Sequence, residues 1–433
     1  MKIAIIGSGI SGLTCAWHLH RHHDITVYEA NAYIGGHTAT VDVSLPSGEY
    51  AIDTGFIVFN DRTYPRFEAL LAELGIAGLP TEMSFSVQND EHGLEYNGHN
   101  LSSMFAQKRN YLNPRFYRFI ADILRFNKLA REVDLKTATC RTLGEFLEEN
   151  RFNTYFSENY ILPMGAAIWS STLSDMRAFP LEFFIRFFRN HGLLEVTNRP
   201  QWFVIPGGSR EYVHRLVAPF QERLLLSHPV RQIFRHQGKV KVVTAHGSDI
   251  YDQVILACHS DQALALLGDA TEDEQRILGA MAYQDNEVIL HTDTRLLPDN
   301  KSAWAAWNYH LGAPTAEREH QLASLTYNMN ILQRLSAPET FCVSLNQSGQ
   351  IAEEKILRRF TYAHPVFTTT SMLAQQSREV INGRRSTWFC GAYWYNGFHE
   401  DGVRSALDVV AGVEARAQQP HPTGHPESSG MVL

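Results

Sequence analysis

The fold is decided at the beginning of the chain, where residues 1–30 read MKIAIIGSGISGLTCAWHLHRHHDITVYEA. Met1–Ile6 form a short apolar run that ends at a glycine, which is typical of a buried parallel strand. Ser11–His20 have the pattern of a helix, and Asp24–Glu29 have the pattern of a second strand. Together these segments predict a strand–helix–strand unit whose two strands are parallel.

A glycine fingerprint lies where the first strand meets the helix. It has the form GxGxxG, in the residues Gly7-Ser8-Gly9-Ile10-Ser11-Gly12. We expect Gly7 to make the tight turn, Gly9 to let backbone N–H groups approach a diphosphate, and Gly12 to let helix and strand pack closely. The helix N-terminus carries about half a positive charge, which favours the same anion. The segment therefore predicts a dinucleotide site.

An acidic residue stands at the end of the second strand. Glu29 follows Gly12 by 17 residues, and Ala30 is next to it. A carboxylate at this position can bind the ribose hydroxyls of a dinucleotide. Because it would repel a 2′-phosphate, NADP is disfavoured at this site.

Five further segments resemble the flavin-containing amine oxidase and phytoene desaturase superfamily. They occur in the order found there: Ala32–His37 with Gly35, Gly36 and His37; Ile52–Phe56 with Thr54, Gly55 and Phe56; Pro229–Ile233 with Val230; Tyr251–Ala257; and Phe389–Val403 with Gly391, Gly402 and Val403. The resemblance implies that the first segment closes over the phosphates of FAD, the second passes the flavin ring, and the third follows a helix, precedes a strand and contacts the adenine. The fourth returns to the cofactor domain. The last brings a helix N-terminus to flavin O2, where it would stabilise a reduced flavin.

The resemblance extends to about residue 416 and implies an α/β protein. Its fold would be a two-dinucleotide-binding-domain (Rossmann-like) FAD fold with an inserted α+β substrate domain. We expect a discontinuous FAD-binding domain in residues 1–80, 200–260 and 385–416. The substrate-binding domain would comprise residues 81–199, largely helical, and 261–384, where runs at 286–292, 321–328 and 340–346 predict a second sheet. Residues 417–433 have little apolar content and are expected to be disordered.

Within the superfamily the chain resembles a bacterial branch of predicted NAD/FAD-binding oxidoreductases. The segments that carry this resemblance are Met83–Val87, Pro163–Ser170, Pro206–Arg210 and Gly397–Gly402. Members of that branch are associated with enzymes that modify membrane fatty acids. The resemblance therefore implies a role in fatty acid modification and lipid metabolism.

The chain departs from its relatives at three points. His37 stands where many relatives have arginine, so a fixed positive charge near the diphosphate is lost unless the imidazole is protonated. No cysteine corresponds to the one that binds flavin covalently, and Cys390 lies on the preceding strand. The FAD is therefore expected to be non-covalent. The lysine that many amine oxidases hold beside flavin N5 is not evident, which argues against ordinary amine oxidation.

No catalytic residue is identified with certainty by the pattern. The candidates are Trp169, Tyr393, Trp394, Tyr395, His399 and Glu400. The four aromatic residues could form a wall beside the flavin, since tryptophan and tyrosine offer rigid apolar surface with one polar group. Plain packing is the alternative. His399 and Glu400 could act as acid or base, or could only shape the start of the last helix.

Composition excludes several classes. The net charge is −8, so nucleic acid is not an expected partner. The five cysteines are odd in number and widely spaced, which disfavours a disulfide framework and a metal site. No secretory signal and no run of about 18 apolar residues is present. We expect a cytoplasmic protein, with peripheral contact on the inner face of the membrane as a further possibility.

That possibility rests on residues 104–131, which hold seven basic residues and one acid, Asp122, before Glu132. The basic residues are Lys108, Arg109, Arg115, Arg118, Arg125, Lys128 and Arg131. Six apolar residues share one helical face: Phe116, Phe119, Ile120, Ile123, Phe126 and Ala130. The helix could lie on anionic lipid headgroups. The alternative is a solvated basic face over an ordinary core.

The favoured function is that of a FAD-dependent oxidoreductase that moves hydride from a substrate C–H to flavin N5. The preferred substrate is an unsaturated or branched fatty acyl chain, free or on phospholipid. Three alternatives stay open: redox-neutral isomerisation of a fatty acid double bond, amine oxidation with release of hydrogen peroxide, and a membrane-associated protein in which FAD is only structural. The oligomeric state and the electron acceptor are not indicated.

Overall fold

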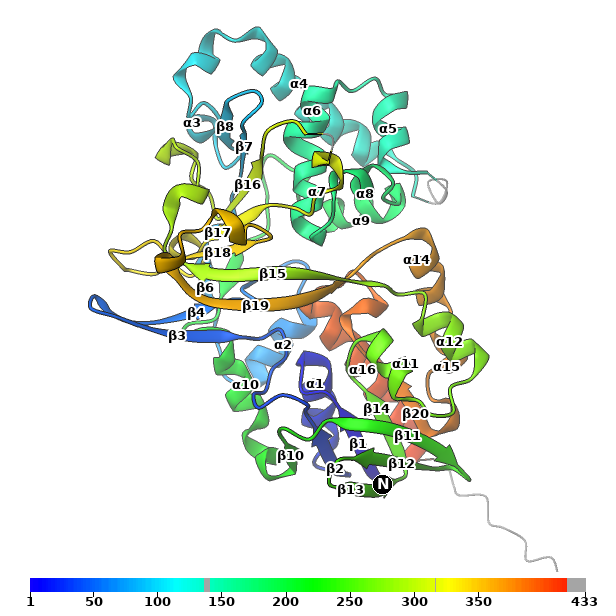
Figure 1. Cartoon of the computed structure of the whole chain (residues 1–433). Coiled ribbons are helices and arrows are strands. Elements are labelled where there is room, and N and C mark those ends of the chain that lie inside the picture. The colour runs from blue at the N-terminus through cyan, green and yellow to red at the C-terminus, as the bar shows by residue number, and fades with distance from the viewer. Residues whose placement is uncertain (136–140, 316, 419–433) are drawn as a thin grey trace, which may run out of the picture.

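The computed structural model describes residues 1–135, 141–315 and 317–418. The predicted tail, residues 417–433, falls almost entirely outside these ranges. Among the described residues, no helix is both long enough and apolar enough to cross a bilayer. Two large sheets organise the molecule, with a helical region at one end (Figure 1).

A parallel five-stranded sheet contains the strand–helix–strand unit. Its order is β10 (Leu224–Leu225), β2 (Asp24–Tyr28), β1 (Lys2–Ile6), β14 (Gln253–Leu256) and β20 (Thr387–Phe389). Ile5 pairs with Val27 on one side and with Ile255 on the other. Apolar side chains at both faces explain why these strands are continuous apolar runs in the sequence.

Helices cover one face of this sheet. They are α1 (Ile10–Leu19), α2 (Pro65–Glu73), α10 (Arg210–Val217) and α16 (His399–Ala417), and their buried residues share one core with β1 and β2. The other face packs against a three-stranded antiparallel sheet and two helices: β11 (Val230–His236), β12 (Lys239–Thr244), β13 (Gly247–Tyr251), α11 (Ser260–Leu266) and α12 (Glu272–Leu278). The result is a three-layer α/β arrangement.

The second large sheet has seven strands. Their order is β19 (Ile356–Pro365), β15 (Tyr283–His291), β18 (Cys342–Leu345), β17 (Leu325–Asn328), β16 (Trp307–Leu311), β7 (Phe85–Asn89) and β8 (Leu94–Asn97). All pairs are antiparallel except β16 with β7. Strands β15 and β19 cross the middle of the molecule, between the helical region and the parallel sheet (Figure 1).

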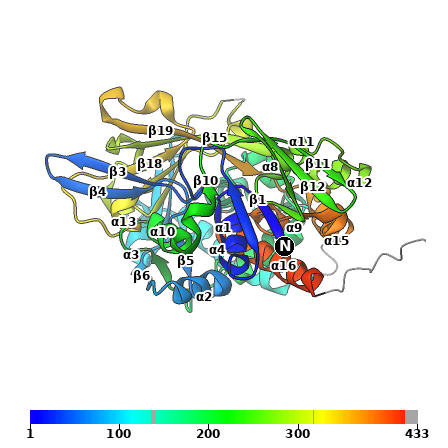
Figure 2. The same ribbon diagram turned by 90° about the horizontal axis from the view of Figure 1, so that it is seen from below.

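Smaller elements connect the two sheets. They are β3 (Thr40–Leu45) with β4 (Gly48–Asp53), β5 (Val58–Asn60) with β9 (Trp202–Val204) and β6 (Leu79–Thr81), and the helices α13 (Met329–Leu332), α14 (Thr369–Gln376) and α15 (Arg378–Ile381). Figure 2 shows the β3–β4 hairpin at one side of the molecule and strands β11 and β12 at the other.

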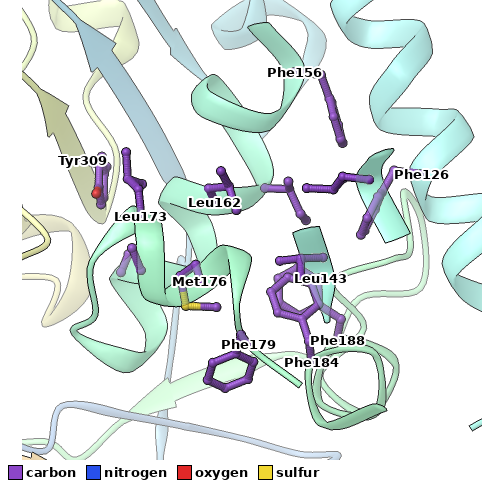
Figure 3. Packing of buried hydrophobic residues seen from close by; sticks show 14 of the residues in the cluster. Phe126, Leu143, Phe156, Leu162, Leu173, Met176, Phe179, Phe184, Phe188 and Tyr309 are labelled. Carbon is purple, nitrogen blue, oxygen red and sulfur yellow. The ribbon is translucent and has the colours of Figure 1, made fainter. Parts of the chain in front are cut away.

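The described residues of the helical region form seven α-helices. They are α3 (Leu101–Met104), α4 (Pro114–Glu132), α5 (Leu143–Glu149), α6 (Thr154–Phe156), α7 (Leu162–Trp169), α8 (Leu173–Arg177) and α9 (Leu181–Asn190). The predicted apolar face of α4 is part of its core, with Phe116, Phe119 and Phe126 almost fully buried. Figure 3 shows Phe126, Phe184 and Phe188 in this packing.

The two large sheets take their strands from different parts of the chain. The parallel sheet takes its strands from residues 1–80, 200–260 and 385–416, and the seven-stranded sheet takes its strands from the remaining ranges. One element differs from the sequence prediction, because Val230 begins strand β11 instead of preceding it. Strand β12 belongs to the antiparallel sheet, where exposed Lys239 and Lys241 face solvent. Strands β16 and β19 were not predicted.

Candidate functional site

The glycine turn between β1 and α1 leaves an open helix N-terminus. Gly7 has φ +106°, a conformation that other residues rarely adopt, and donates its N–H to the Tyr28 carbonyl at 2.8 Å. Gly9 has an extended backbone, and a Cβ added there would meet no protein atom within 4 Å. No side chain among the described residues caps α1. An anion can therefore approach the free N–H groups directly.

Glu29 lies beside this turn with its carboxylate fixed. One oxygen, Oε2, accepts the backbone N–H and the hydroxyl of Ser8, at 2.9 and 2.6 Å. The other, Oε1, accepts the backbone N–H of Asn31 at 2.8 Å. A carboxylate has about four acceptor sites, so capacity is left for a ribose hydroxyl.

The two other predicted loops touch the glycine turn and each other. Gly35 pairs with Gly9, and a Cβ on Gly36 would lie 3.2 Å from the Gly9 Cα. A Cβ on Gly55 would lie 2.0 Å from the His37 carbonyl oxygen, which accepts the N–H of Phe56 at 2.8 Å. These contacts leave no room for side chains, so backbone atoms of all three loops come together.

The carboxylate of Asp53 fixes the loop that carries Thr54 through several hydrogen bonds. Its Oδ1 accepts the hydroxyl of Thr40 and both the N–H and the hydroxyl of Ser209, at 2.6 to 2.9 Å, and Oδ2 accepts the amide of Gln333 at 3.1 Å. Burial raises the pKa of Asp53 to about 6. The predicted segment Pro206–Arg210 is thus joined to the loop that carries Thr54.

Three histidine rings meet at His37, and two of them were missed by the sequence analysis. The His37 centroid lies 5.9 Å from that of His259 and 5.7 Å from that of His364. His259 precedes α11, whereas His364 belongs to β19, so the cluster joins the two large sheets. His259 follows the carboxyl end of a parallel strand, where α/β sheets bind ligands, and this position could have indicated it.

The histidines are neutral, and none of the three residues is fully buried. Burial lowers the pKa of His37 to about 3 and that of His364 to about 4. Nε2 of His37 is buried with no hydrogen-bond partner among the described residues. Nδ1 of His364 lies 3.1 Å from Ser170 Oγ and 3.2 Å from Asn286 Nδ2. A buried polar atom without a protein partner is suited to binding a ligand.

The closing segment of the chain meets the opening one. Ser11 Oγ donates to the carbonyl of Gly402 at 3.0 Å, and a Cβ on Gly402 would lie 2.7 Å from Ile10 Cγ2. Gly391 donates its N–H to Ser405 Oγ at 2.9 Å, and Val403 is buried in the core shared with α1. The N-termini of α1 and α16 therefore lie side by side.

His399 and Glu400, both candidates for acid or base, have structural partners. The His399 ring stacks on Phe56 at 3.7 Å, and its Nε2 lies 2.8 Å from the hydroxyl of Tyr212, which contacts Thr38 at 2.6 Å. Burial lowers the pKa of His399 to about 3. Glu400 accepts the N–H of Phe67 at 2.9 Å and so caps α2, not its own helix.

The aromatic candidates separate into two groups. Trp169 packs on Phe179 at 4.6 Å and precedes Ser170, which contacts His364, and its Nε1 is unpaired among the described residues. Tyr393 lies close to Gly391, and its hydroxyl is also unpaired there.

The other two aromatic candidates, Trp394 and Tyr395, have partners for their polar atoms. Trp394 donates its Nε1 to the Phe389 carbonyl at 3.1 Å, and Tyr395 donates its hydroxyl to Asp408 at 2.6 Å. Both rings lie against the guanidinium of Arg378. Their polar atoms are therefore used within the protein. The described residues contain no group of His, Cys, Asp and Glu arranged to hold a metal ion.

Comparison with known proteins identifies the family. Residues 10–333 match the family model of flavin containing amine oxidoreductases. A putative flavin-containing monoamine oxidase of Mycobacterium tuberculosis, AofH, is 27% identical over 279 residues, which cover 59% of this chain and 56% of the relative. An L-amino acid dehydrogenase of Synechocystis is 25% identical over 255 residues, 56% of this chain and 52% of the relative. The chain thus spans about half the length of the curated relatives it matches.

Solved structures agree over nearly the whole chain. A cyclohexylamine oxidase from Brevibacterium oxydans has a TM-score of 0.69 at 14% identity, covering 96% of this chain and 99% of that one. A fatty acid isomerase from P. acnes that produces CLA has a TM-score of 0.68 at 16% identity, covering 95% and 98%. A putative protoporphyrinogen oxidase from Exiguobacterium has a TM-score of 0.66 at 18% identity, covering 96% and 99%. The predicted two-dinucleotide-binding-domain FAD fold is confirmed.

Proposed function

Because the chain belongs to the family of flavin containing amine oxidoreductases, we propose that it is a FAD-dependent oxidoreductase with non-covalent FAD. One observation carries the proposal. The hydrogen bond from Ser11 to Gly402 joins residues 391 positions apart and sets the N-termini of α1 and α16 beside each other. Two helix N-termini in contact suit a cofactor that is anionic at its diphosphate and, when reduced, at its ring.

The residues present fit FAD. The open face of Gly9 and the uncapped start of α1 would hold the diphosphate, and Glu29 would hold the adenosine ribose. Strand β11 would contact the adenine from Val230, and Gly402 and Val403 would lie at the flavin. Cys390 is buried with its Sγ 3.9 Å from that of Cys15, which favours non-covalent binding.

FAD, when bound, supplies a hydride acceptor. The protein supplies position: the neutral rings of His37, His259 and His364 lie together at the cofactor loops, and the aromatic Trp169 directly precedes Ser170, which contacts His364. Hydride transfer needs the substrate carbon to be held close and water to be excluded. Aromatic walls and uncharged imidazoles suit both requirements.

The same features favour an uncharged, apolar substrate, and we propose an unsaturated or branched fatty acyl chain. Phe183 stacks on Phe367 at 5.1 Å, and Phe187 on Phe398 at 4.9 Å, which brings the aromatic core of the helical region to the start of α16. Acids on the cofactor segments, such as Asp53 and Glu400, already accept hydrogen bonds from the protein. A protonated amine would have to compete for them.

Anaerobic reduction of the purified yellow protein tests this proposal. We expect a phosphatidylglycerol with monounsaturated chains to bleach the visible flavin band, while putrescine and benzylamine leave it unchanged. Bleaching by the amines alone, with hydrogen peroxide on exposure to air, would establish amine oxidation and overturn the lipid substrate. Reduction by dithionite but by no organic compound, with acyl chains that are recovered chemically unchanged, would indicate a structural flavin.

Double-bond isomerisation is the second candidate, since a fatty acid isomerase shares the fold. It predicts a product of unchanged mass, no net loss of flavin absorbance and no consumption of an oxidant. Mass spectrometry of the recovered acyl chains after aerobic incubation separates it from dehydrogenation, which removes two hydrogens. A protein that stays colourless after incubation with FAD would contradict both candidates.

A further inference from the structure

Exposed apolar residues concentrate at the far end of the helical region. Five of the twelve large hydrophobic residues that are clearly exposed among the described residues lie between positions 101 and 124. They are Leu101, Tyr111, Leu112, Tyr117 and Leu124. Leu112 is 91% exposed, the highest of the twelve. Such a concentration is unusual on a surface that meets only water.

Aromatic contacts order part of this end. The Tyr111 ring stacks on Phe105 at 4.6 Å, and the Tyr117 hydroxyl donates to the Tyr111 carbonyl at 3.1 Å. Leu112 follows directly, at the end of a short 3-10 helix (Lys108–Leu112). In Figure 1 this connection between α3 and α4 forms the end of the molecule opposite the parallel sheet. We name Lys108, Tyr111, Leu112, Tyr117 and Arg118 the tip surface.

The tip surface carries positive charge that the protein does not neutralise. Lys108 and Arg118 have no ion pair or hydrogen bond from their side chains to any described residue, and Lys128 further along α4 has none either. Other cations of the segment are occupied: Arg125 pairs with Asp122 at 3.1 Å, and Arg131 with Glu195. The chain as a whole is negative, so this charge is local.

We propose that the tip surface docks on an anionic lipid bilayer, with Leu112 entering the interface and Lys108 and Arg118 binding headgroups. The predicted apolar face of α4 does not take part, because Phe116, Phe119 and Phe126 are used in the core. Tyrosine suits the interface, since its ring is apolar and its hydroxyl is polar. A projecting loop with one fully exposed leucine enters a deformable surface more readily than it fits a rigid protein face.

Docking at this end would bring a source of acyl chains to the helical region. The buried core that begins beneath the tip surface, at Phe116 and Phe119, is one cluster that includes Phe367, and the partly buried Phe398 packs against it. The inference agrees with a lipid substrate but does not depend on it, since vesicle binding is measured without turnover. A failure to bind vesicles would leave the redox proposal standing.

Co-sedimentation with vesicles tests the docking. The protein should bind vesicles that contain phosphatidylglycerol and phosphatidylcholine, and it should dissociate from them at high salt. It should not bind vesicles of phosphatidylcholine alone. Lys108→Glu with Arg118→Glu should weaken binding at least roughly 30-fold, since each cation near an anionic surface contributes about a fivefold gain. The matched control, Lys241→Glu with Lys355→Glu, reverses two exposed lysines elsewhere and should bind as the wild type does.

Insertion has its own readout. Tryptophan placed at Leu112 should shift its emission to the blue on addition of the anionic vesicles, whereas tryptophan at Leu373, exposed on α14, should not. Equal binding by the charge-reversed protein and the wild type would overturn the proposal. So would a dimer in vesicle-free solution that Leu112→Asp dissociates, because the surface would then join two copies. The flavin spectrum and the melting temperature report whether each variant is folded.

Discussion

The cofactor loops and the helical region are held together by different kinds of contact. In the loops, backbone meets backbone, and one added carbon on Gly55 would lie 2.0 Å from a carbonyl oxygen. In the helical region, side-chain volume fills the space, as where Phe184 stacks on Phe188 at 4.1 Å. The loops therefore require particular residues at particular positions, whereas the core requires apolar volume that several residues can supply. Motifs can be recognised in the first case and only composition in the second.

The sharpest test of this difference is Gly9→Val. Its backbone conformation is open to any residue, and no protein atom lies where the side chain would go, so the fold should persist. The side chain would occupy the expected diphosphate position and lower FAD affinity by at least about a thousandfold, or about 4 kcal/mol. Fluorescence titration with FAD and a thermal melt measure the two effects. Gly312→Val, also in open space but far along the chain, serves as the control.

Phe184→Ala should lower the stability of the fold and leave FAD binding intact, the reverse of what is expected for Gly9→Val. Phe184 is fully buried, and its removal should lower the free energy of unfolding by about 3 to 5 kcal/mol. Phe184→Leu, which keeps most of the volume, should cost much less. Urea denaturation measures both, with the flavin spectrum of the folded protein expected to stay unchanged. Release of flavin from folded Phe184→Ala would mean that the two parts are not separable in this way.

The third test is the pH dependence at His399. Its folded pKa of about 3 lies below the ordinary value of 6.5, so the unfolded chain binds the extra proton as the pH falls. The neutral ring therefore contributes its full share to the free energy of unfolding above pH 6.5. That contribution falls by roughly 3 kcal/mol between pH 6.5 and 4. His399→Gln should remove that part of the acid destabilisation in the flavin-free protein. Identical slopes for the two proteins in urea melts from pH 4 to 7 would contradict the assignment.

The smallest effect is expected at Tyr212. Tyr212→Phe removes the hydroxyl shared by Thr38 and His399, at a cost of about 1 kcal/mol. Tyr251→Phe removes a comparable buried hydroxyl contact, 2.7 Å from Tyr28, in the antiparallel sheet. Both variants should lose similar stability, but only Tyr212→Phe should alter FAD affinity. Equal FAD affinity in the two would place His399 outside the cofactor site.

Most of the cofactor domain could be predicted because its determinants are local. The glycine spacing, the strand before it and Glu29 all lie within 30 residues, and the structure brings them together as expected. The meeting of the first and last segments was implied by family resemblance, since nothing in the residues between Ser11 and Gly402 indicates that they touch. His364 was not predicted because the strand that carries it, β19, was not recognised. This strand lies at the edge of its sheet with Arg358 and Arg359 exposed, so it has no continuous apolar run.

The sequence predicted that this region is largely helical, but it did not predict what covers the apolar faces of its helices. Periodicity assigned Phe116 and Phe126 to one face of α4, yet it could not tell whether protein or lipid covers that face. Leu112 lies in a short 3-10 helix outside the periodic stretch, so no sequence pattern predicts its exposure. Likewise, the sequence could not distinguish Trp169, whose Nε1 is unpaired among the described residues, from Tyr395, whose hydroxyl donates to Asp408.

The parallel sheet imposes an order on biosynthesis. Strand β20 and helix α16, which complete the sheet and cover α1, come more than 350 residues after β1. A nascent chain emerging from the ribosome therefore exposes an unfinished sheet edge and the apolar side of α1 until α16 has been made. Chains released early could not assemble the second helix N-terminus, and they would be substrates for chaperones and proteases instead of partly active enzymes.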